Sequence, residues 1–477
     1  MSRASARENK TTMNRRKTTT TRVGGITIGG DSPIRVQSMT TTNTNDTAAC
    51  VAQAKRIIDA GGELVRLTTQ GRREAENMAA ISAALNADGY HAPLVADVHF
   101  NANVADIAAR HCQKVRINPG NYVDPARTFK KLQYTDEEYA AELTKIEERL
   151  VPFLHICRQH HTAIRIGVNH GSLSDRIMSR YGDTPEGIVE SCMEFLRICR
   201  REDFNDVVLS IKASNTVVMV TSVRLLVKAM DKEDMHYPLH LGVTEAGEGE
   251  DGRIKSAVGI GALLTEGIGD TIRVSLSEEP EREIPVAKKL VAFTPQCATM
   301  RQQARIESGT LHLTLSEDNA EDLQLKAAMA AGALLIDRKA TDLVIHNDGC
   351  GTEQELRTLA DSILQAARVR FTKTEYISCP GCGRTLYDLQ GTIARIKAAV
   401  SQAAKDDPRF ATLKIGIMGC IVNGPGEMAD ADYGYVGAGP AKISLYKGKQ
   451  CVEKAIPEAE AVGRLLDFIK KDIDITQ

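Results

Sequence analysis

Three cysteines in the last quarter of the chain have the spacing of metal ligands. Cys379 and Cys382 share one short turn in the stretch ISCPGCGR, and Cys420 follows later in MGCIVNGPGE. Glycines and prolines around them leave backbone N–H groups free to point at sulfur, which suits metal-bound thiolates. The pattern predicts a metal site that lacks one ligand of a closed four-cysteine set.

Two metals remain open on spacing alone. Structural zinc needs four Cys or His ligands, and no histidine follows His346, so zinc would need Cys451 or an imported ligand. A 4Fe-4S cluster can be held by three thiolates, and its fourth iron can then bind substrate as a Lewis acid. The NGPG turn could bring Glu427 back toward such an iron, although a solvated turn residue is the plainer interpretation.

The chain has 11 cysteines without a repeating framework, which is typical of a reducing compartment. We expect the other cysteines, including Cys192 and Cys199, to be ordinary buried or surface thiols.

Short β-branched runs alternate with longer helical stretches from residue 33 onward, the pattern of parallel strands joined by crossover helices. Eight such units are the number of a (β/α)8 barrel, whose strands deliver their C-terminal ends to one face. Thr135 and Glu138 have the spacing of a capping box at a helix start. The expected strands span residues 33–39, 63–69, 93–99, 114–120, 163–169, 207–213, 239–245 and 271–277.

The ends of these strands carry many charged and polar side chains. Guanidinium groups match phosphate oxygens bidentately, so four arginines and a lysine at one barrel face predict a site for a diphosphate. The alternative is that several of these cations pair with Asp or Glu on neighbouring strands. The residues are Arg66, Asp97, His99, Arg116, Asn118, Arg165, Asn169, Lys212, Ser214, Glu245, Arg273 and Ser275.

Two of these side chains could move protons. Glu245 is the acid at the end of the seventh strand, in LGVTEAGEG, and is a candidate proton donor or charge partner at the reacting carbon. His99, in DVHFN, is as well explained by a hydrogen-bonded structural role as by a catalytic one.

Composition excludes several classes of partner. The net charge of −2 favours no nucleic acid, and the sequence has no apolar run long enough for a membrane span and no secretory signal, so we expect a cytoplasmic protein. Residues 1–22 are basic, polar and Thr-rich, and we interpret them as a disordered tail.

Many ordered segments, among them VRLTTQ, DVHFN, RIGVNHGSLSDRI, LHLGVTEAG, SCPGCGR and MGCIVNGPGE, resemble those of the 4-hydroxy-3-methylbut-2-enyl diphosphate synthase family of the methylerythritol phosphate route to isoprenoids. The resemblance covers nearly everything from residue 22 onward. It implies a substrate-binding barrel over residues 23–295, an insert or linker over 296–370, and a smaller α/β iron–sulfur domain over 371–477.

The resemblance also implies a reaction. Family members open 2-C-methyl-D-erythritol 2,4-cyclodiphosphate and remove a hydroxyl by two-electron reduction, with flavodoxin or ferredoxin as donor. Cys379, Cys382 and Cys420 would hold a 4Fe-4S cluster, with Glu427 as a fourth ligand that substrate displaces, and Glu245 would assist near the ring carbons. The diphosphate would be bound by Arg66, His99, Arg116, Arg165, Lys212 and Arg273, with Asn118, Asn169, Ser214 and Ser275 adding neutral hydrogen bonds.

The segment between the eighth strand and Cys379 departs from compact family members, in which it is short. Long-form members carry an extra domain there, and residues 330–349 resemble a remnant of one that is too short for a second barrel. We expect this shortened spacer to be insufficient for one chain to close on itself, and therefore expect a head-to-tail homodimer in which the cluster domain of one subunit caps the barrel of the other. A pterin- or corrinoid-linked methyl transferase and a zinc-stabilised binding protein are the competing functions.

Overall fold

The computed structural model describes residues 15–124, 133–421, 424–428 and 430–475. Eight parallel strands form one sheet in the order β8-β7-β6-β5-β4-β3-β10-β9, and a parallel bridge from Leu209 to Leu239 closes it. This confirms the predicted (β/α)8 barrel. Its strands are β3 (Arg35–Met39), β4 (Leu64–Thr69), β5 (Leu94–Val98), β6 (Lys114–Ile117), β7 (Ala163–Asn169), β8 (Val207–Lys212), β9 (His240–Leu241) and β10 (Thr271–Ile272).

Helices cover the outside of the barrel, as crossover connections between parallel strands require. The capping box of α5 is confirmed, because the Thr135 N–H donates to Glu138 Oε2 at 2.8 Å and the Glu138 N–H donates to Thr135 Oγ1 at 3.2 Å. The helices are α1 (Thr47–Asp59), α2 (Arg72–Ala87), α3 (Ala102–Ala108), α4 (Pro119–Tyr122), α5 (Asp136–His160), α6 (Asp175–Tyr181), α7 (Pro185–Arg201), α8 (Thr216–Lys232), α9 (Gly249–Leu264) and α10 (Glu283–Gln303).

The N-terminal hairpin of β1 (Thr20–Val23) and β2 (Ile26–Gly29) corrects the interpretation of residues 1–22 as a disordered tail. Residues 1–14 lie outside the described residues, but residues 15–22 are ordered. Arg15 forms an ion pair with Asp270 at 2.8 Å, and Thr21 Oγ1 donates to the backbone carbonyl of Val207 at 2.9 Å. Polar composition did not leave this segment disordered, because the barrel supplies partners for its polar side chains and buries Val23 and Ile28 of the same hairpin.

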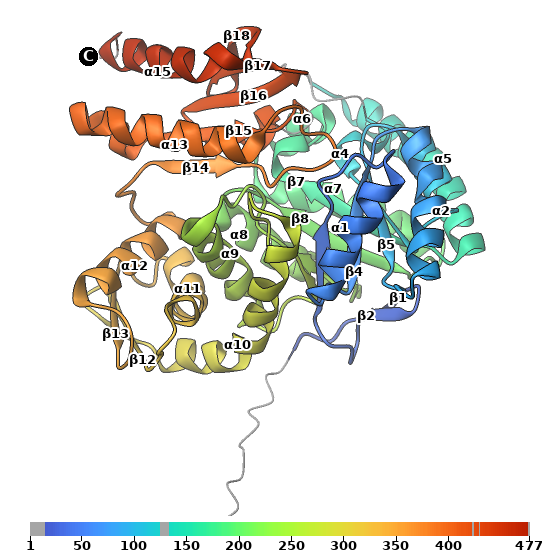
Figure 1. The fold of residues 1–477 in the computed structure, drawn as a ribbon. Coiled ribbons are helices and arrows are strands. Elements are labelled where there is room, and N and C mark those ends of the chain that lie inside the picture. Colours follow the sequence, from blue (N-terminus) through green and yellow to red (C-terminus); the bar gives the residue numbers. More distant parts are fainter. Residues whose placement is uncertain (1–14, 125–132, 422–423, 429, 476–477) are drawn as a thin grey trace, which may run out of the picture.

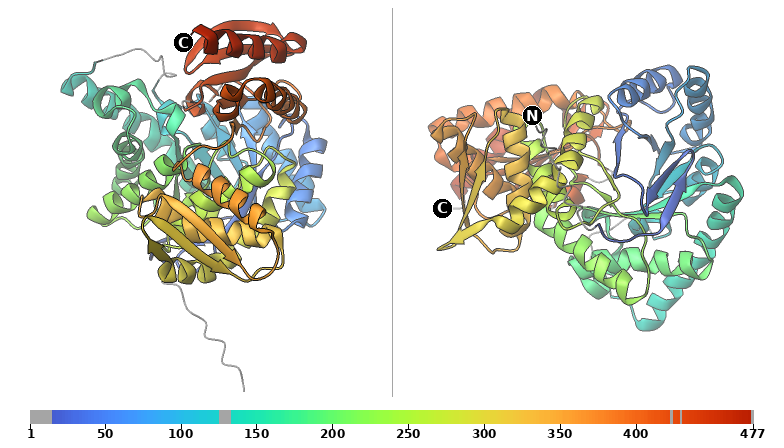
Figure 2. Two further views of the ribbon diagram at one scale, coloured as in Figure 1. Left: turned by 90° about the vertical axis from the view of Figure 1, so that its left-hand side faces the viewer. Right: turned by 90° about the horizontal axis from the view of Figure 1, so that it is seen from below.

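The insert packs against the side of the barrel instead of forming a separate body. It contains β11 (Arg305–Glu307), β12 (Thr310–Leu315), α11 (Ala320–Ile336), β13 (Asp342–Asn347) and α12 (Glu353–Ala366), and its buried residues share one hydrophobic core with the barrel. Helices α9 and α11 approach closely at Gly261 and Gly332. A Cβ on Gly332 would lie 2.6 Å from the Val258 carbonyl oxygen. Figure 2 shows these insert elements in yellow and orange beside the barrel.

The C-terminal elements form a second unit with its own core. They are β14 (Glu375–Ser378), α13 (Leu389–Asp406), β15 (Lys414–Met418), α14 (Gly424–Glu427), β16 (Tyr433–Gly439), β17 (Lys442–Lys447), β18 (Gln450–Pro457) and α15 (Glu458–Ile475), and their sheet runs β14-β15-β16-β17-β18. This mixed sheet with helices agrees with the smaller α/β domain predicted after the barrel. The part of the chain that the structure describes has no helix long and apolar enough to cross a membrane.

Figure 1 shows the C-terminal domain above the barrel of its own chain. Ser277 Oγ, after the last barrel strand, lies 3.0 Å from Ser378 Oγ at the end of β14, and Arg384 forms an ion pair with Asp97 at 3.7 Å. The expectation that a shortened spacer prevents closure within one chain is therefore wrong. The insert lies flat against the barrel and returns the chain to the barrel mouth, so a few residues after α12 suffice to begin β14. Dimerisation itself stays a prediction.

Candidate active site

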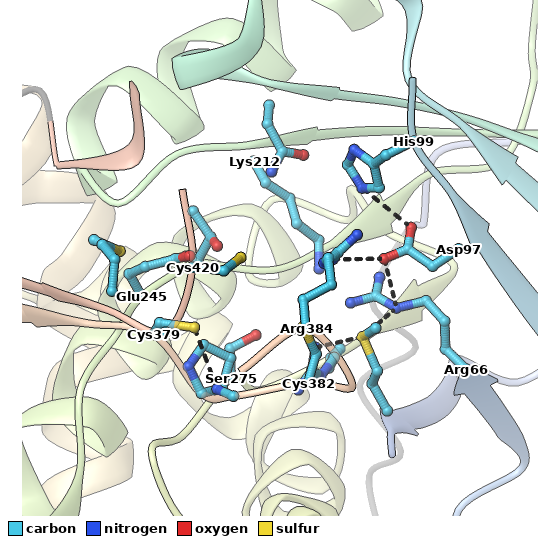
Figure 3. A pocket seen from close by; sticks show the side chains of 18 of the residues that line it. Arg66, Asp97, His99, Lys212, Glu245, Ser275, Cys379, Cys382, Arg384 and Cys420 are labelled. Atoms are coloured by element: carbon cyan, nitrogen blue, oxygen red, sulfur yellow. Dashed lines mark hydrogen bonds and ion pairs between the residues drawn. The ribbon is translucent and has the colours of Figure 1, made fainter. Parts of the chain in front are cut away.

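One cavity lies between the barrel mouth and the C-terminal domain (Figure 3). It brings together most side chains that the sequence analysis proposed, from seven of the eight barrel strands or the loops after them and from the loops after β14 and β15. The lining residues are Met39, Arg66, Asp97, His99, Arg116, Arg165, Asn169, Lys212, Thr244, Glu245, Arg273, Ser275, Cys379, Pro380, Gly381, Cys382, Arg384, Met418, Gly419, Cys420 and Gly424.

Two of the barrel arginines are held by buried carboxylates. Arg116 Nη1 donates to Asp97 Oδ1 at 3.0 Å, and Arg273 donates to both oxygens of Glu283 at 2.9 and 3.0 Å. These pairs fix the guanidinium groups without removing them from the cavity. The alternative raised from the sequence, that some strand-end cations pair with neighbouring acids, therefore holds for Arg116 and Arg273, and also for Arg66, which forms a longer ion pair with Asp97 at 3.9 Å.

Arg165 and Lys212 are in a different situation. The Nε and Nη1 atoms of Arg165 are buried without a hydrogen-bond partner among the residues that the structure describes. Burial lowers the pKa of Lys212 well below its usual value, and the charges of Arg66, Arg165 and Arg273 lower it further. Positive charge that is buried and not neutralised is costly, and a bound anion would offset that cost.

Asp97 and His99 connect the cations at the end of β5. Burial alone would raise the pKa of Asp97, but Arg116 and Arg66 hold it well below its usual value, so the carboxylate is charged. Burial and the Arg116 charge lower the pKa of His99 to about 3, so the imidazole is neutral and contacts Arg116. His99 can therefore offer hydrogen bonds to a ligand but carries no positive charge.

Three of the proposed residues have other positions. Asn118 does not line the cavity, because its side chain caps α4 through Gly120 N–H at 3.2 Å and donates to Ser172 Oγ at 2.8 Å. Ser214 Oγ donates to the backbone carbonyl of Glu427 at 2.9 Å and so holds the C-terminal domain. Glu427 is buried behind the lining residues, where its Oε1 accepts from Asn169 Nδ2 at 2.8 Å.

The three cysteines of the predicted metal site face the cavity from two loops. Cys379 follows β14, where its N–H donates to the Ile417 carbonyl of β15 at 3.0 Å, and its Sγ accepts from the Gly381 N–H at 3.3 Å. Figure 3 shows Cys379, Cys382 and Cys420 beside Glu245 and Arg384. Burial works against the charged form of Arg384, yet the Cys382 thiol and Asp97 raise its pKa, so a guanidinium stands next to the thiols.

The two acids of the site share a buried environment. Burial raises the pKa of Glu245 to about 7 against the opposing charges of Lys212 and Arg273. Burial also raises the pKa of Glu427 well above its usual value, and the negative charge of Glu245 adds to this effect. The Oε2 atoms of both acids have no hydrogen-bond partner among the described residues. Near neutral pH the pair therefore holds at least one proton.

Glu245 also has an unusual backbone. Its φ is 49°, in the left-handed region that a side chain with a Cβ disfavours. Such strained residues cluster at functional sites, where the surrounding structure holds them in place.

Sequence reasoning missed the role of one important lining residue and left out another. Asp97 stood among the strand ends, but its role as the carboxylate shared by several arginines was not foreseen. Arg384 was overlooked although it closes the quoted stretch SCPGCGR. A cation next to two cysteines was the available signal, because positive charge favours thiolates.

Comparisons with known proteins agree with this geometry. Residues 18–288 match the family model of the GcpE TIM-barrel domain, and residues 375–471 match that of the GcpE protein C-terminal domain. A 4-hydroxy-3-methylbut-2-en-1-yl diphosphate synthase (flavodoxin) of Bacteroides thetaiotaomicron is 51% identical and aligns with 96% of this chain and 98% of its own length. Proteins of the same description from Porphyromonas gingivalis and Akkermansia muciniphila are 44% and 40% identical, each over 96% of this chain and over 98% and 96% of their own lengths.

The alignment with the Bacteroides thetaiotaomicron protein extends over 607 residues, more than the 477 of this chain, so that relative contains residues that this chain lacks. Identity at this level over almost the whole of both chains, together with matches to both family domains, leaves one conclusion. The chain belongs to the GcpE family, that of the 4-hydroxy-3-methylbut-2-en-1-yl diphosphate synthases.

Proposed function

We propose that this chain uses the cavity to convert 2-C-methyl-D-erythritol 2,4-cyclodiphosphate into 4-hydroxy-3-methylbut-2-enyl diphosphate, as the names of its relatives indicate for the product. The reaction opens the diphosphate ring and removes one hydroxyl as water, with two electrons from an external donor. One observation carries the proposal: buried basic side chains and three thiols face the same cavity, and two nitrogens of Arg165 have no hydrogen-bond partner among the described residues. The family matches support the diphosphate synthase reaction and not the methyl transferase alternative.

Arg165 and Lys212 are the side chains that we assign to direct binding of the diphosphate. Charge-assisted hydrogen bonds to phosphate oxygens would satisfy the donors of Arg165 that lack partners. Arg116 and Arg273 are already oriented by Asp97 and Glu283, so they present a fixed second face to the same anion. Arg66, His99, Asn169 and Ser275 of the predicted contact set also line the cavity, whereas Asn118 and Ser214 of that set do not.

The donor set fits a 4Fe-4S cluster. Cys379, Cys382 and Cys420 would be its thiolate ligands, supported by the Gly381 N–H and by the positive charge of Arg384. No group of three or more His, Cys, Asp or Glu side chains among the described residues is arranged around a single ion. Cluster ligands bind different irons and therefore stand further apart than the ligands of one zinc ion. When bound, the cluster would supply the electrons and a Lewis-acidic iron.

The two acids would have different roles, one in proton transfer to the departing hydroxyl and the other in binding the cluster. With a pKa of about 7, Glu245 can hold a proton in the closed cavity and release it as oxygen leaves. Glu427, next to the Cys420 loop, is our candidate for the exchangeable fourth ligand. Asn169 holds its Oε1, while Oε2 has no partner among the residues described and is free to bind.

The electron donor that we infer is flavodoxin, which the names of the relatives include, or a ferredoxin. Cytoplasmic location and a homodimer remain predictions.

Metal analysis tests the proposal. Anaerobically purified protein should contain iron and sulfide near four of each per chain, show the visible absorbance of a 4Fe-4S cluster, and turn over the cyclodiphosphate with reduced flavodoxin. A colourless, zinc-only protein would contradict the cluster assignment. Glu427→Ala with unchanged turnover would remove Glu427 from the mechanism.

A further inference from the structure

A buried charge network joins the barrel, the insert and the C-terminal domain away from the catalytic cavity. At its centre is Glu375, the first residue of β14, which is only 9% exposed. Lys255 of α9 donates to Glu375 Oε1 at 3.0 Å, and Arg368, two residues after α12, donates to Oε2 at 2.5 Å. The barrel and the insert thus each contribute one positive charge to a single buried carboxylate of the C-terminal domain.

Arg368 extends this network toward the catalytic loop. Its Nη2 forms an ion pair with Asp430 Oδ2 at 3.5 Å but has no hydrogen-bond partner among the described residues. The same Asp430 oxygen accepts a hydrogen bond from Asn215 Nδ2 of the barrel at 2.7 Å. Asp430 follows closely after Glu427 in the chain. A residue of the insert is therefore connected through one carboxylate to the part of the chain that follows Glu427, behind the cavity lining.

The barrel holds the other end of this segment. Ser214 Oγ donates to the Glu427 carbonyl at 2.9 Å, and a Cβ on Gly426 would lie 1.9 Å from the Gly171 carbonyl oxygen. The segment is thus fixed by backbone contact at Gly426 and by side chains at Asp430. Within the segment, the Glu427 carboxyl group accepts a hydrogen bond from Asn169 Nδ2 at 2.8 Å.

We propose that Arg368, anchored by Glu375, is a positioning residue that holds Asp430 beside the barrel and thereby keeps residues 424–428, with the Glu427 carboxyl group, against Asn169 of the cavity lining. The proposal rests on the proposed function only for the chemical role of Glu427. It gives the insert of this chain a function: the insert delivers a guanidinium to the junction on which closure of one chain on itself depends.

An arginine suits this position better than a lysine. Its guanidinium offers separate nitrogens to two carboxylates from different parts of the chain, whereas an ammonium on a flexible stem cannot hold both in one geometry. The Arg368 backbone has φ of 59°, in the left-handed region, at the turn after α12 that aims the side chain into the junction. A lysine, which keeps the positive charge at residue 368, is therefore not expected to hold both carboxylates.

Arg370 provides a matched control. It lies two residues further along and also pairs with two acids, Asp342 at 3.2 Å and Asp361 at 2.6 Å, but both belong to the insert. Arg370→Ala removes the same charge and a similar double ion pair without touching the C-terminal domain.

Hydrogen exchange on the full-length protein tests the proposal. The amides of Met428 and Ala431, which donate to the carbonyls of Gly424 and Met428, report on the segment. We expect them to exchange at least about tenfold faster in Arg368→Lys, Arg368→Ala and Asp430→Asn, because fewer contacts oppose local opening. Amides of β15 should be unaffected, and Arg370→Ala should match the wild type in both regions.

Kinetics give the second readout. Misplacement of a catalytic group by about 1 Å costs about a hundredfold in rate, so kcat of Arg368→Lys should fall by up to that factor while KM stays within about threefold. The effects of Arg368→Ala and Asp430→Asn on exchange should not be additive, because both substitutions remove the same ion pair between Arg368 and Asp430. Additive effects, or unchanged exchange at Met428 and Ala431 in folded Arg368→Lys protein, would overturn the proposal.

Failure of the proposed function has a different signature. If Glu427→Gln keeps full turnover, Glu427 has no chemical role, and the faster exchange in Arg368→Lys then still shows that Arg368 holds the segment. If exchange is unchanged while Glu427→Gln is inactive, the role of Glu427 stands and the positioning role of Arg368 is wrong.

Discussion

The two faces of the catalytic cavity are built in different ways. The barrel face consists of charged side chains at the ends of parallel strands, where Arg116 and Arg165 are neighbours in register and Lys212 is paired in register with Asn169. The opposite face consists of thiols and glycines on short loops after β14 and β15. The first face is rigid because its backbone is part of a closed sheet, whereas the second depends on how the C-terminal domain is docked.

This difference separates binding from chemistry. We expect changes on the barrel face to alter substrate affinity or barrel stability, and changes on the loop face to alter turnover while the anion site stays intact. Each experiment below tests this division, in order of decreasing expected effect.

Removal of a thiol should separate the two faces most clearly. In Cys420→Ala the loop face loses a cluster ligand, and because a Lewis-acidic metal contributes several kcal/mol, turnover should fall about a thousandfold or more. Substrate affinity, measured by calorimetry under anaerobic conditions, should change by less than about fivefold, since Arg165 and Lys212 are untouched. Loss of binding along with turnover would show that the two faces are not independent.

A single methyl group at the contact between the domains should have the next largest effect. In Gly426→Ala the new Cβ would meet the Gly171 carbonyl oxygen at 1.9 Å, so the C-terminal segment must move away from the barrel. We expect kcat to fall about a hundredfold, with the cluster still bound by its three cysteines. Iron content and steady-state kinetics check this, and wild-type kcat in Gly426→Ala would contradict the packing.

Two arginines on the barrel face should fail in opposite ways. Arg165→Ala removes a buried cation whose Nε and Nη1 have no hydrogen-bond partner in the part of the chain that the structure describes, so it should weaken substrate binding about ten- to a hundredfold with little loss of stability. Arg273→Ala leaves the buried Glu283 carboxylate uncompensated, which should cost about 3–5 kcal/mol in the free energy of unfolding. Saturation kinetics and urea denaturation distinguish the two variants. Equal losses of stability in both would contradict the different roles of Arg165 and Arg273.

Glu245 should make stability depend on pH. The pKa of Glu245 is raised to about 7 in the folded chain, so the carboxyl binds its proton more tightly there than when unfolded. Its contribution to stability is full below the unfolded pKa and is lost as pH rises through about 7. The free energy of unfolding of metal-free wild type should therefore decline relative to Glu245→Gln between about pH 4.5 and 7. Parallel curves from urea titrations would contradict the raised pKa.

The smallest effect is expected at the outer contact between the domains. Lys449, in the turn between β17 and β18, pairs with Asp183 of the barrel at 3.3 Å, and both side chains are partly exposed. Lys449→Ala should change stability by less than about 1 kcal/mol and leave kcat unaltered. A large effect on kcat would mean that the loop face is positioned by surface charge and not by the buried contacts.

Much of the site was predictable because the parallel strands of a barrel deliver their C-terminal ends to one face. This property placed Arg66, Arg116, Arg165, Lys212 and Arg273 at one barrel face before any contact was known, and the spacing of Cys379 and Cys382 indicated a metal site. The position of Asn118 was not predicted, because it depends on where the preceding strand ends. Its strand had already ended at Ile117, and capping the next short helix, α4, uses its side chain.

The sequence by itself determined the strand pattern, the charged barrel mouth, the cysteine motif and the family. Only the tertiary structure decided which cations are neutralised, that Ser214 and Asn169 hold Glu427, that residues 15–22 pack under the barrel, and that one chain closes its own site. Periodicity and motif spacing are properties of neighbouring residues. The partner of a charge, such as Arg368 for both Glu375 and Asp430, depends on distances between residues far apart in the chain, and those distances exist only after folding.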